Sequence, residues 1–190
     1  MRGYDSDYII ATRILSSHKW KYMNEIRLRA LEPEDLDVLY AIENDLDLWS
    51  VGYTTVPYSR YLLHDYIANS QCDIYADRQV RLVVEMEDGS DVVGIVDITD
   101  FEPRHNRAEL GLVVRKKYRN MGFGGSVVRK MIDYSREVIH LHQLYVVIDS
   151  NNTSCIDLFK NYGFKESHCL EDWLYDGEKY RKAVFLTLFL

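Results

Sequence analysis

A glycine-rich segment that follows a short apolar run carries the clearest chemical signal in the sequence. Arg119, Gly122 and Gly124 have the spacing Arg-x-x-Gly-x-Gly, and Gly125 and Ser126 follow directly. Glycines let successive backbone N–H groups turn inward around an anion, and a helix that begins there adds the partial positive charge of its N-terminus. The segment therefore predicts a phosphate-binding loop. Glycines that merely end a connector before a helix are the alternative.

The residues around the glycines exclude two well-known phosphate loops. A Walker loop requires a lysine after its last glycine, but Ser126 follows Gly125 directly. A dinucleotide-binding fingerprint requires a third glycine, and Val127 stands at that position. The loop must therefore serve another phosphate-bearing ligand.

The elements that must position this loop can be read from the hydrophobic pattern. Residues 107–114 form a strand-like run before the loop, and apolar residues recur at helical spacing from Val127 to Ile139 after it. Pro33, with acids beside it, marks an earlier helix start. Further helices are expected at 59–70 and 152–162, and further strands at 26–28, 80–86, 92–98, 143–148, 165–175 and 179–190. Hairpins alternate with helical crossovers, so we expect a mixed sheet in an α/β or α+β domain.

Composition narrows the class of protein. The 190 residues suit one domain, which we place at 23–190, with residues 1–22 as an N-terminal extension. The net charge of −7 argues against a general nucleic-acid binder and favours cationic partners such as amines. The three cysteines match no zinc spacing, so no metal is expected, and they suggest a reducing cytoplasm. No apolar run suits a membrane span or a signal peptide.

A second motif lies after the strand at 143–148. Asn152, Cys155, Leu158, Gly163 and Phe164 follow a pattern that resembles Asn-x-x-Ala-x-x-Leu-Tyr-x-x-x-Gly-Phe of the GNAT acetyltransferase superfamily. The glycine loop upstream is similar to the acyl-CoA pyrophosphate loop of the same superfamily. The resemblance covers residues 24–190 and implies the GNAT acyl-CoA N-acyltransferase fold. In that fold about seven strands of mixed direction are flanked by about four helices.

Softer similarities point to one branch of the superfamily. The segments 57–58, 78–81, 106–109 and 141–145 resemble the branch of the ribosomal-protein N-terminal acetyltransferases and the bacterial spermidine or diamine acetyltransferases. This resemblance implies direct transfer of the acetyl group of acetyl-CoA onto a primary amine. The acceptor would be a polyamine, a diamine or a protein N-terminus. A homo-oligomer is possible in such a branch.

The resemblance also implies which residues hold acetyl-CoA. The pantetheine arm would lie along a strand that diverges from its neighbour, beside Leu112, Val113 and Val114, as an added strand would. Asn152 would contact the same arm, or would only cap a helix. The pyrophosphate would lie in the loop, whose expected contacts are Arg119, Asn120, Met121, Gly122, Phe123, Gly124, Gly125 and Ser126.

Acetyl transfer needs a base, because an alkylammonium of pKa about 10 is not a nucleophile. Glu109, on the strand that would present the thioester and a few residues before the slot, is the first candidate for a base or water relay. A salt bridge to Arg107 or a solvated charge is the equally weighted alternative. Asp97 is a second candidate. The histidines His105 and His142 have suitable intrinsic pKa values but are lone residues of a type that is more often structural.

The expected general acid is missing from its family position. Phe159 stands where the superfamily usually has tyrosine, and phenylalanine cannot donate a proton. Tyr162 is the candidate that compensates one turn later. A core aromatic is the stronger interpretation of Tyr162, and the role can also be vacant. Phe159 keeps open the alternative that the protein is a non-catalytic acyl-CoA-binding sensor.

Acidic and aromatic residues are expected where the branch shapes its acceptor site. The acids Glu43, Asp45 and Asp47 can attract a polyamine or a basic N-terminus, or can simply end a helix in solvent. The aromatic residues in the same region are Trp49, Tyr53 and Tyr58. They can pack on the methylene groups of an acceptor or on the core.

Overall fold

The protein is described by a computed structural model for residues 25–49, 56–70 and 73–190. Seven strands form one sheet in the order β1-β2-β3-β4-β5-β7-β6. The strands are β1 (Ile26–Ala30), β2 (Val80–Met86), β3 (Val92–Glu102), β4 (Arg107–Val114), β5 (Gln143–Asp149), β6 (Lys165–Tyr175) and β7 (Tyr180–Phe189). The helices are α2 (Leu36–Glu43), α3 (Leu46–Trp49), α4 (Arg60–Asn69), α5 (Ile74–Asp77), α6 (Phe123–Glu137) and α7 (Thr153–Asn161), with 3₁₀ turns η1 (Pro33–Asp35) and η2 (Lys116–Tyr118).

The strand pairing makes the sheet mixed, as the sequence predicted. The pair of β4 and β5 is parallel, and the other five neighbouring pairs are antiparallel. The prediction of about seven strands is confirmed. The four predicted helices are present as η1–α2, α4, α6 and α7, and the one-turn helices α3 and α5 were not predicted.

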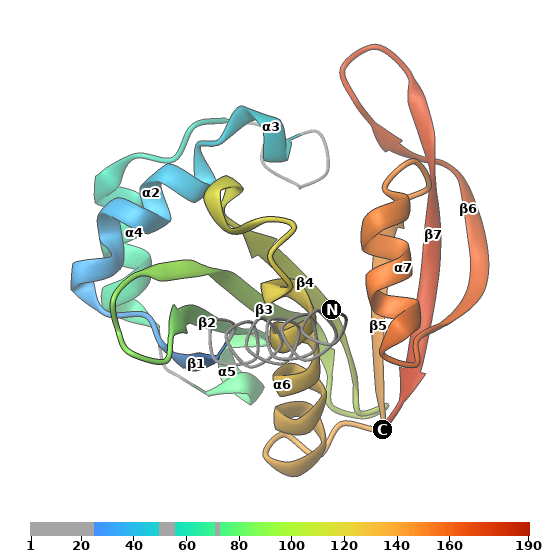
Figure 1. The fold of residues 1–190 in the computed structure, drawn as a ribbon, viewed down its shortest axis with the longest axis horizontal. Helices are drawn as coiled ribbons and strands as arrows, with labels where there is room; N and C mark the ends of the chain where they lie inside the picture. Colours follow the sequence, from blue (N-terminus) through green and yellow to red (C-terminus); the bar gives the residue numbers. More distant parts are fainter. Residues whose placement is uncertain (1–24, 50–55, 71–72) are drawn as a thin grey trace, which may run out of the picture.

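Helices cover both faces of the sheet (Figure 1). Successive side chains of a strand point to opposite faces. In β3, Val96 accordingly packs with the core that includes α6 and α7, whereas Ile95 packs with the smaller core of α2 and α4. β4 alternates in the same way: Leu110 lies in the core with α6 and α7, and Val113 lies against the core with α2 and α4.

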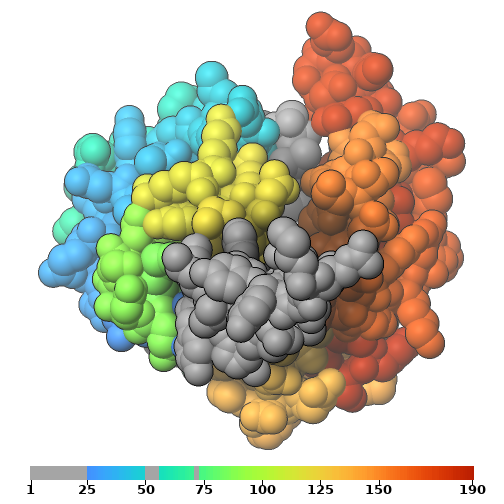
Figure 2. All heavy atoms as spheres, in the orientation of Figure 1, coloured from blue at the N-terminus to red at the C-terminus, as the bar shows by residue number. Residues whose placement is uncertain are grey.

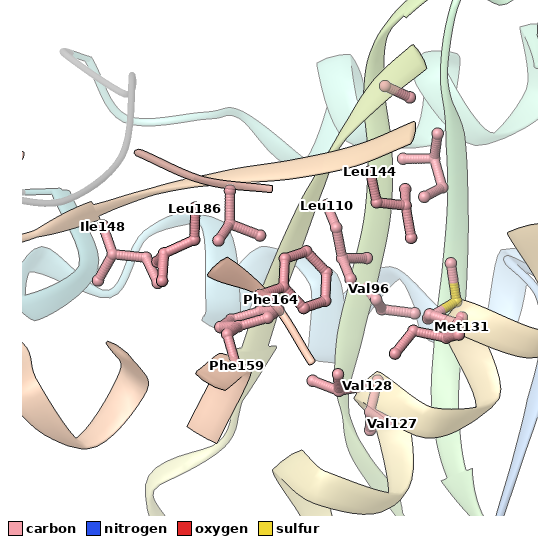
Figure 3. Packing of buried hydrophobic residues seen from close by; sticks show 14 of the residues in the cluster. Val96, Leu110, Val127, Val128, Met131, Leu144, Ile148, Phe159, Phe164 and Leu186 are labelled. Carbon is pink, nitrogen blue, oxygen red and sulfur yellow. The ribbon is translucent and has the colours of Figure 1, made fainter. Parts of the chain in front are cut away.

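The larger core fixes α6 and α7 against the sheet. Val127, Val128 and Met131 form the buried stripe of α6, each at most 1% exposed. Phe159 of α7 lies against Phe164 with the ring planes at 78° and the ring centroids 5.1 Å apart. Figure 3 shows these side chains together with those of the central strands. This packing sets where the glycine loop, at the start of α6, lies relative to the sheet.

Some predictions fall outside the described residues. The extension 1–22, the acceptor candidate Tyr53 and the thiol Cys72 belong to segments that the structure does not describe, so they stay predictions. Within the described segments, no helix has the length and hydropathy that crossing a membrane requires. In the same segments, no cluster of side chains suits a metal ion.

Candidate active site

The sheet opens between β4 and β5. These strands pair over only three residues, and the last pair joins Glu109 to Tyr145. Beyond it β4 stays paired with β3 up to Val114, and β5 stays paired with β7 up to Asp149. Both strands therefore continue while their mutual pairing has ended. Backbone groups of β4 that face β5 are therefore left without a strand partner. An extended ligand can hydrogen-bond to such groups in the way that an added strand would.

The predicted slot residues lie on this diverging part of β4. Leu112 and Val114 pack against the core of α6 and α7, and Val113 packs against the core of α2 and α4. The backbone of these residues runs between the two helical layers. This arrangement gives an extended ligand a backbone edge with apolar walls.

The glycine loop lies where β4 leads into α6. Gly122, with φ of 85°, precedes the first residue of the helix, and Asn120 is also left-handed with φ of 60°. The first turn of an α-helix leaves backbone N–H groups without intrahelical acceptors, here those of Phe123, Gly124 and Gly125. Such a turn is a ready site for a phosphate group.

Hydrogen bonds within the protein already engage groups of two loop residues, Ser126 and Arg119. The N–H of Ser126 donates to the carbonyl of Gly122 at 3.4 Å, so the hydroxyl of Ser126 is its more available group. Arg119 Nε donates to the carbonyl of Val114 at 2.9 Å, which ties the exposed side chain to the end of β4. Met121 packs on the hydrophobic core beside the loop.

The glycines also have a packing role that the sequence did not reveal. A Cβ on Gly125 would lie 2.5 Å from the hydroxyl of Tyr162, and one on Gly124 would lie 3.1 Å from a methyl of Leu158. α7 therefore approaches α6 so closely that a Cβ on Gly125 would force Tyr162 to move, whereas one on Gly124 would require only a small shift of Leu158. Helix packing contributes to the glycine requirement alongside any anion. In Figure 2 the yellow surface of the connector (residues 115–118, which follow β4) and of the glycine loop faces the orange surface of α7.

Basic residues surround the approach to the loop. A cavity of about 290 Å³ between α2, α3 and the connector is lined by Arg115, Lys116, Lys117 and Arg119, among others.

Asp91 fixes the connector: it accepts hydrogen bonds from Arg115 at 2.8 Å and Tyr118 at 2.6 Å, and it pairs with Lys117. Burial alone would raise the pKa of Asp91, but these donors outweigh it and hold the pKa well below its usual range.

Glu109 stands at the point where β4 and β5 diverge. It lines a cavity of about 530 Å³ on the sheet face opposite α6 and α7. Burial, followed by the charge of Asp100, raises the pKa of Glu109 to about 7, while the N–H of Val147 opposes the shift. Among the described residues, Glu109 forms no ion pair with Arg107. The predicted base therefore has a protonation equilibrium close to neutral pH.

The rest of this cavity is largely aromatic and apolar. The rings of Tyr145 and Phe185 stack with centroids 5.0 Å apart and planes at 20°. The complete lining consists of Asp100, Arg107, Glu109, Gln143, Tyr145, Val147, Leu170, Trp173 and Phe185. Of these residues, the sequence had singled out only Glu109 as a base. Glu109 and Tyr145 point to the same face of the sheet because they are paired on neighbouring strands. Their positions in the sequence do not reveal this pairing, which only the structure shows.

Asp97, the second base candidate, is instead bound in an ion-pair network. Arg81 donates to both carboxylate oxygens of Asp97, at 2.7 and 3.0 Å, and to Glu43 at 2.5 Å. The guanidinium of Arg81 also lies over the ring of Tyr66. Glu43, a candidate to attract the acceptor, pairs with Arg81 in the same network. Asp97 therefore belongs to this network and is not among the residues that line the cavity of Glu109.

The other acceptor candidates within the described residues do not converge on the cavity beside Glu109. Asp45 and Asp47 contact Lys116 of the connector, and Trp49 donates to the carbonyl of Glu43 at 2.9 Å. Tyr58 packs with the core of α2 and α4. The exposed histidines, His105 and His142, are not among the residues that line the cavity.

α7 carries the remaining candidates. The side chain of Asn152 accepts from the N–H of Cys155 at 3.2 Å, so Asn152 caps the helix and only its amide NH₂ remains for a ligand. Phe159 is 2% exposed and belongs to the core. Tyr162 lies on the α6 side of the sheet with its hydroxyl over Gly125, whereas Glu109 faces the opposite side.

Comparison with known proteins identifies the family of the chain. The sequence model of a family described as "Acetyltransferase (GNAT) domain" matches residues 25–165. The chain is similar to spermidine N(1)-acetyltransferase of Escherichia coli strain K12, with 24% identity over 167 residues that cover 87% of each chain. It is 25% identical over 155 residues to the enzyme of the same name from Vibrio cholerae, covering 81% of this chain and 87% of the relative.

A solved structure shares the fold. The spermidine N-acetyltransferase from Vibrio cholerae in complex with CoA and spermine superposes with a TM-score of 0.78 and 23% identity, covering 87% of this chain and 95% of that one. The likeness confirms the predicted fold. With the family match over residues 25–165, it shows that the chain belongs to the GNAT family of acetyltransferases, enzymes that carry an acetyl group from acetyl-CoA to an amine.

Proposed function

We propose that this protein acetylates a primary amine of a linear diamine or polyamine, with acetyl-CoA as the donor. The observation that carries the proposal is the position of Glu109. It stands where β4 and β5 diverge and lines a cavity of carboxylate and aromatic side chains. Carboxylates attract ammonium groups, and aromatic faces bind both cations and methylene groups. The relatives named for spermidine support the same class of acceptor.

The donor would lie along the diverging edge of β4. Its pyrophosphate fits the first turn of α6, where the N–H groups of Phe123, Gly124 and Gly125 meet the positive end of the helix dipole. Arg119 and Asn120 flank this turn. The pantetheine arm would run beside Leu112, Val113 and Val114, with the amide of Asn152 within the same slot. Bound acetyl-CoA supplies an activated thioester carbonyl.

Glu109 would accept the proton of the acceptor ammonium, directly or through a water molecule. A base is most effective when its pKa lies near the working pH, and the environment of Glu109 raises the pKa to about 7. Unpaired backbone N–H groups of β4 would stabilise the negative charge that develops on the thioester oxygen. The proton that the departing thiolate receives would come from water or from Tyr162.

The catalytic interpretation is favoured over the acyl-CoA-binding sensor. The sensor was kept open because Phe159 cannot act as an acid, but the matched family and the relatives are acetyltransferases. A protein N-terminus is the second candidate acceptor. A segment of 69 residues is 29% identical to an N-alpha-acetyltransferase of Sulfurisphaera tokodaii, which favours testing it. A cytoplasmic location and a homo-oligomeric state remain predictions.

A panel of acceptors tests the proposal. Release of free CoA is measured with spermidine, 1,4-diaminobutane, n-butylamine, a peptide with a free N-terminal serine, and a free amino acid. We expect the highest kcat/KM with spermidine or the diamine, because these substrates carry further ammonium groups. A higher kcat/KM with the peptide or the amino acid would overturn the assignment.

A further inference from the structure

A bulge in β3 brings a second carboxylate into the cavity of Glu109. Two residues of β3, Asp100 and Phe101, stand opposite the single residue Ala108 of β4. Phe101 takes the inward position in the core of α6 and α7 and is 3% exposed. Asp100 has a left-handed backbone with φ of 50° and lines the cavity. Bulges of this kind re-aim a side chain and are frequent beside active sites.

Regular pairing would have placed this carboxylate elsewhere. Side chains alternate along a strand, so Asp100 would point to the same face as Ile98, which is fully buried in the apolar core. A carboxylate buried there without a partner would be strongly unfavourable. Aspartate tolerates the left-handed conformation better than most residues. The bulge therefore turns Asp100 from the core into the cavity.

The charges of the cavity are unbalanced in favour of a cation. Its lining contains two carboxylates, Asp100 and Glu109, and a single guanidinium, that of Arg107. Within the described chain, no ion pair of 4 Å or less joins Arg107 to either carboxylate. The stacked rings of Tyr145 and Phe185 give the cavity an apolar wall. The negative charge of Asp100 is close enough to act on Glu109, whose pKa it helps to raise.

From this arrangement we infer that Asp100 determines specificity by binding a second ammonium group of the acceptor while Glu109 receives the amine that reacts. The inference rests on the proposed function and makes it more specific. Neighbouring strands lie about 4.8 Å apart, a separation that the ammonium groups of a short alkyl diamine can span. Asp100 binds the ammonium group that does not react, and Glu109 exchanges the proton of the nitrogen that becomes acetylated.

The test compares a diamine with a monoamine of the same length. Asp100→Asn removes the charge and retains a residue type that accepts the left-handed backbone. In the wild type, kcat/KM for 1,4-diaminobutane should exceed that for n-butylamine. In Asp100→Asn this ratio should fall roughly tenfold or more, mainly through the KM of the diamine, because charge-assisted hydrogen bonds typically contribute at least one decade in affinity. An unchanged ratio overturns the inference.

Asp172→Asn is the matched control. Asp172 also lies in a strand beside a register shift and has φ of 48°, but it is not among the residues that line the cavity. In Asp172→Asn the ratio of kcat/KM for 1,4-diaminobutane to kcat/KM for n-butylamine should equal that of the wild type. An equal fall of this ratio in Asp172→Asn and Asp100→Asn would overturn the inference.

Binding separates the two proposals. Calorimetry with spermidine in the presence of CoA should show that Asp100→Asn binds spermidine more weakly than the wild type does. If the wild type turned over no amine but this difference in binding were present, only the proposed function would be refuted. Equal binding of spermidine by both proteins would overturn the inference.

Discussion

Glu109 shows how its surroundings prepare an ordinary carboxylate for proton transfer. Burial disfavours the ionised form, and the charge of Asp100 adds to this effect. The N–H of Val147 partly offsets both, and the pKa settles at about 7. The N–H is free to do so because β5 no longer pairs with β4 beyond Tyr145. The divergence of the strands therefore contributes to both the donor slot and the character of the base.

Glu109→Gln should abolish the acidic limb of the pH profile. The wild-type kcat/KM should rise as pH increases through about 7, where Glu109 loses its proton. The variant has no such group and should lose a factor of roughly 10²–10⁴ in kcat/KM. Steady-state kinetics across the pH range measures both effects. A variant that retains the acidic limb would contradict the role of Glu109.

The same substitution should stabilise the folded protein at alkaline pH. Because folding raises the pKa of Glu109 from its usual 4.5 to about 7, the unfolded chain binds fewer protons between these values. Stability therefore falls as pH rises from about 4.5 to about 7 and levels off above it. Glu109→Gln removes this penalty. We expect a gain on the order of 1–3 kcal/mol at pH 8, reduced by the partial exposure of the group, and little change near pH 4.5. Urea unfolding of the wild type and of Glu109→Gln at the two pH values measures the difference in the free energy of unfolding.

Tyr162→Phe should cost less than about tenfold in kcat/KM, well short of the roughly 10²–10⁴ that a general acid contributes. The hydroxyl of Tyr162 lies over Gly125 in a packed contact between helices, and Phe159 offers no acid. We expect the thiolate to take its proton from water. The alkaline pH profile is the measurement. A falling alkaline limb that vanishes in the variant would assign the acid role to Tyr162.

At the scale of elements, the contact between α6 and α7 holds the glycine loop in place. The two helices meet through positions without a side chain, and Gly125 is the tighter of the two. α7 begins at its cap, Asn152, and ends before Gly163, which has φ of 92°. The second sequence motif therefore describes a helix whose ends are fixed and whose middle packs against the phosphate loop.

Gly125→Ala should destabilise the protein by about 1–3 kcal/mol through overpacking. The added Cβ would lie 2.5 Å from the Tyr162 hydroxyl and 3.3 Å from two carbons of its ring. Tyr162→Phe removes the nearest atom, so the double variant should recover part of the loss. A double-mutant cycle by chemical denaturation measures this coupling. Strict additivity of the two changes would show that the contact is not the cause.

The connector before α6 offers a test of donor binding that avoids helix packing. Arg119→Glu reverses an exposed charge beside the loop, and calorimetry should show acetyl-CoA binding weakened by roughly tenfold or more. Arg129→Glu is the control, because Arg129 is exposed on α6 beyond the first turn of that helix. Equal affinities in the two variants would refute the assigned pyrophosphate position.

At the scale of the whole molecule, the sheet consists of two parts joined by a short parallel ladder. β1 to β4 carry α2 and α4 on one face, and β5 to β7 carry the wall of the cavity beside Glu109. The three residue pairs between β4 and β5 connect them. The donor slot and the acceptor cavity therefore both arise from where this ladder ends.

The net charge of −7 predicts a salt-dependent reaction with cationic acceptors. Raising the ionic strength from about 0.05 to 0.5 M shortens the screening length severalfold and should lower kcat/KM for spermidine. n-Butylamine, with one charge, should respond less. Initial rates in a series of NaCl concentrations provide the measurement. A rate with spermidine that is insensitive to salt would contradict electrostatic attraction of the acceptor.

The sequence by itself determined the order of the strands and of the four longer helices, the mixed sheet and the family. Alternation in strands and the spacing of Val127, Val128 and Met131 in α6 are local patterns, which a chain displays without its partners. The glycine loop and the cap at Asn152 are local as well. Glu109 could be proposed as the base because its strand leads directly into the loop.

Only the tertiary structure decided how these parts meet. The end of the β4–β5 ladder, the bulge that turns Asp100 into the cavity and the capture of Asp97 by Arg81 depend on strand register between distant segments. The close approach of Tyr162 to Gly125 depends on the packing of two helices. Register and packing are set by the fit of the whole core, so no short stretch of sequence contains them.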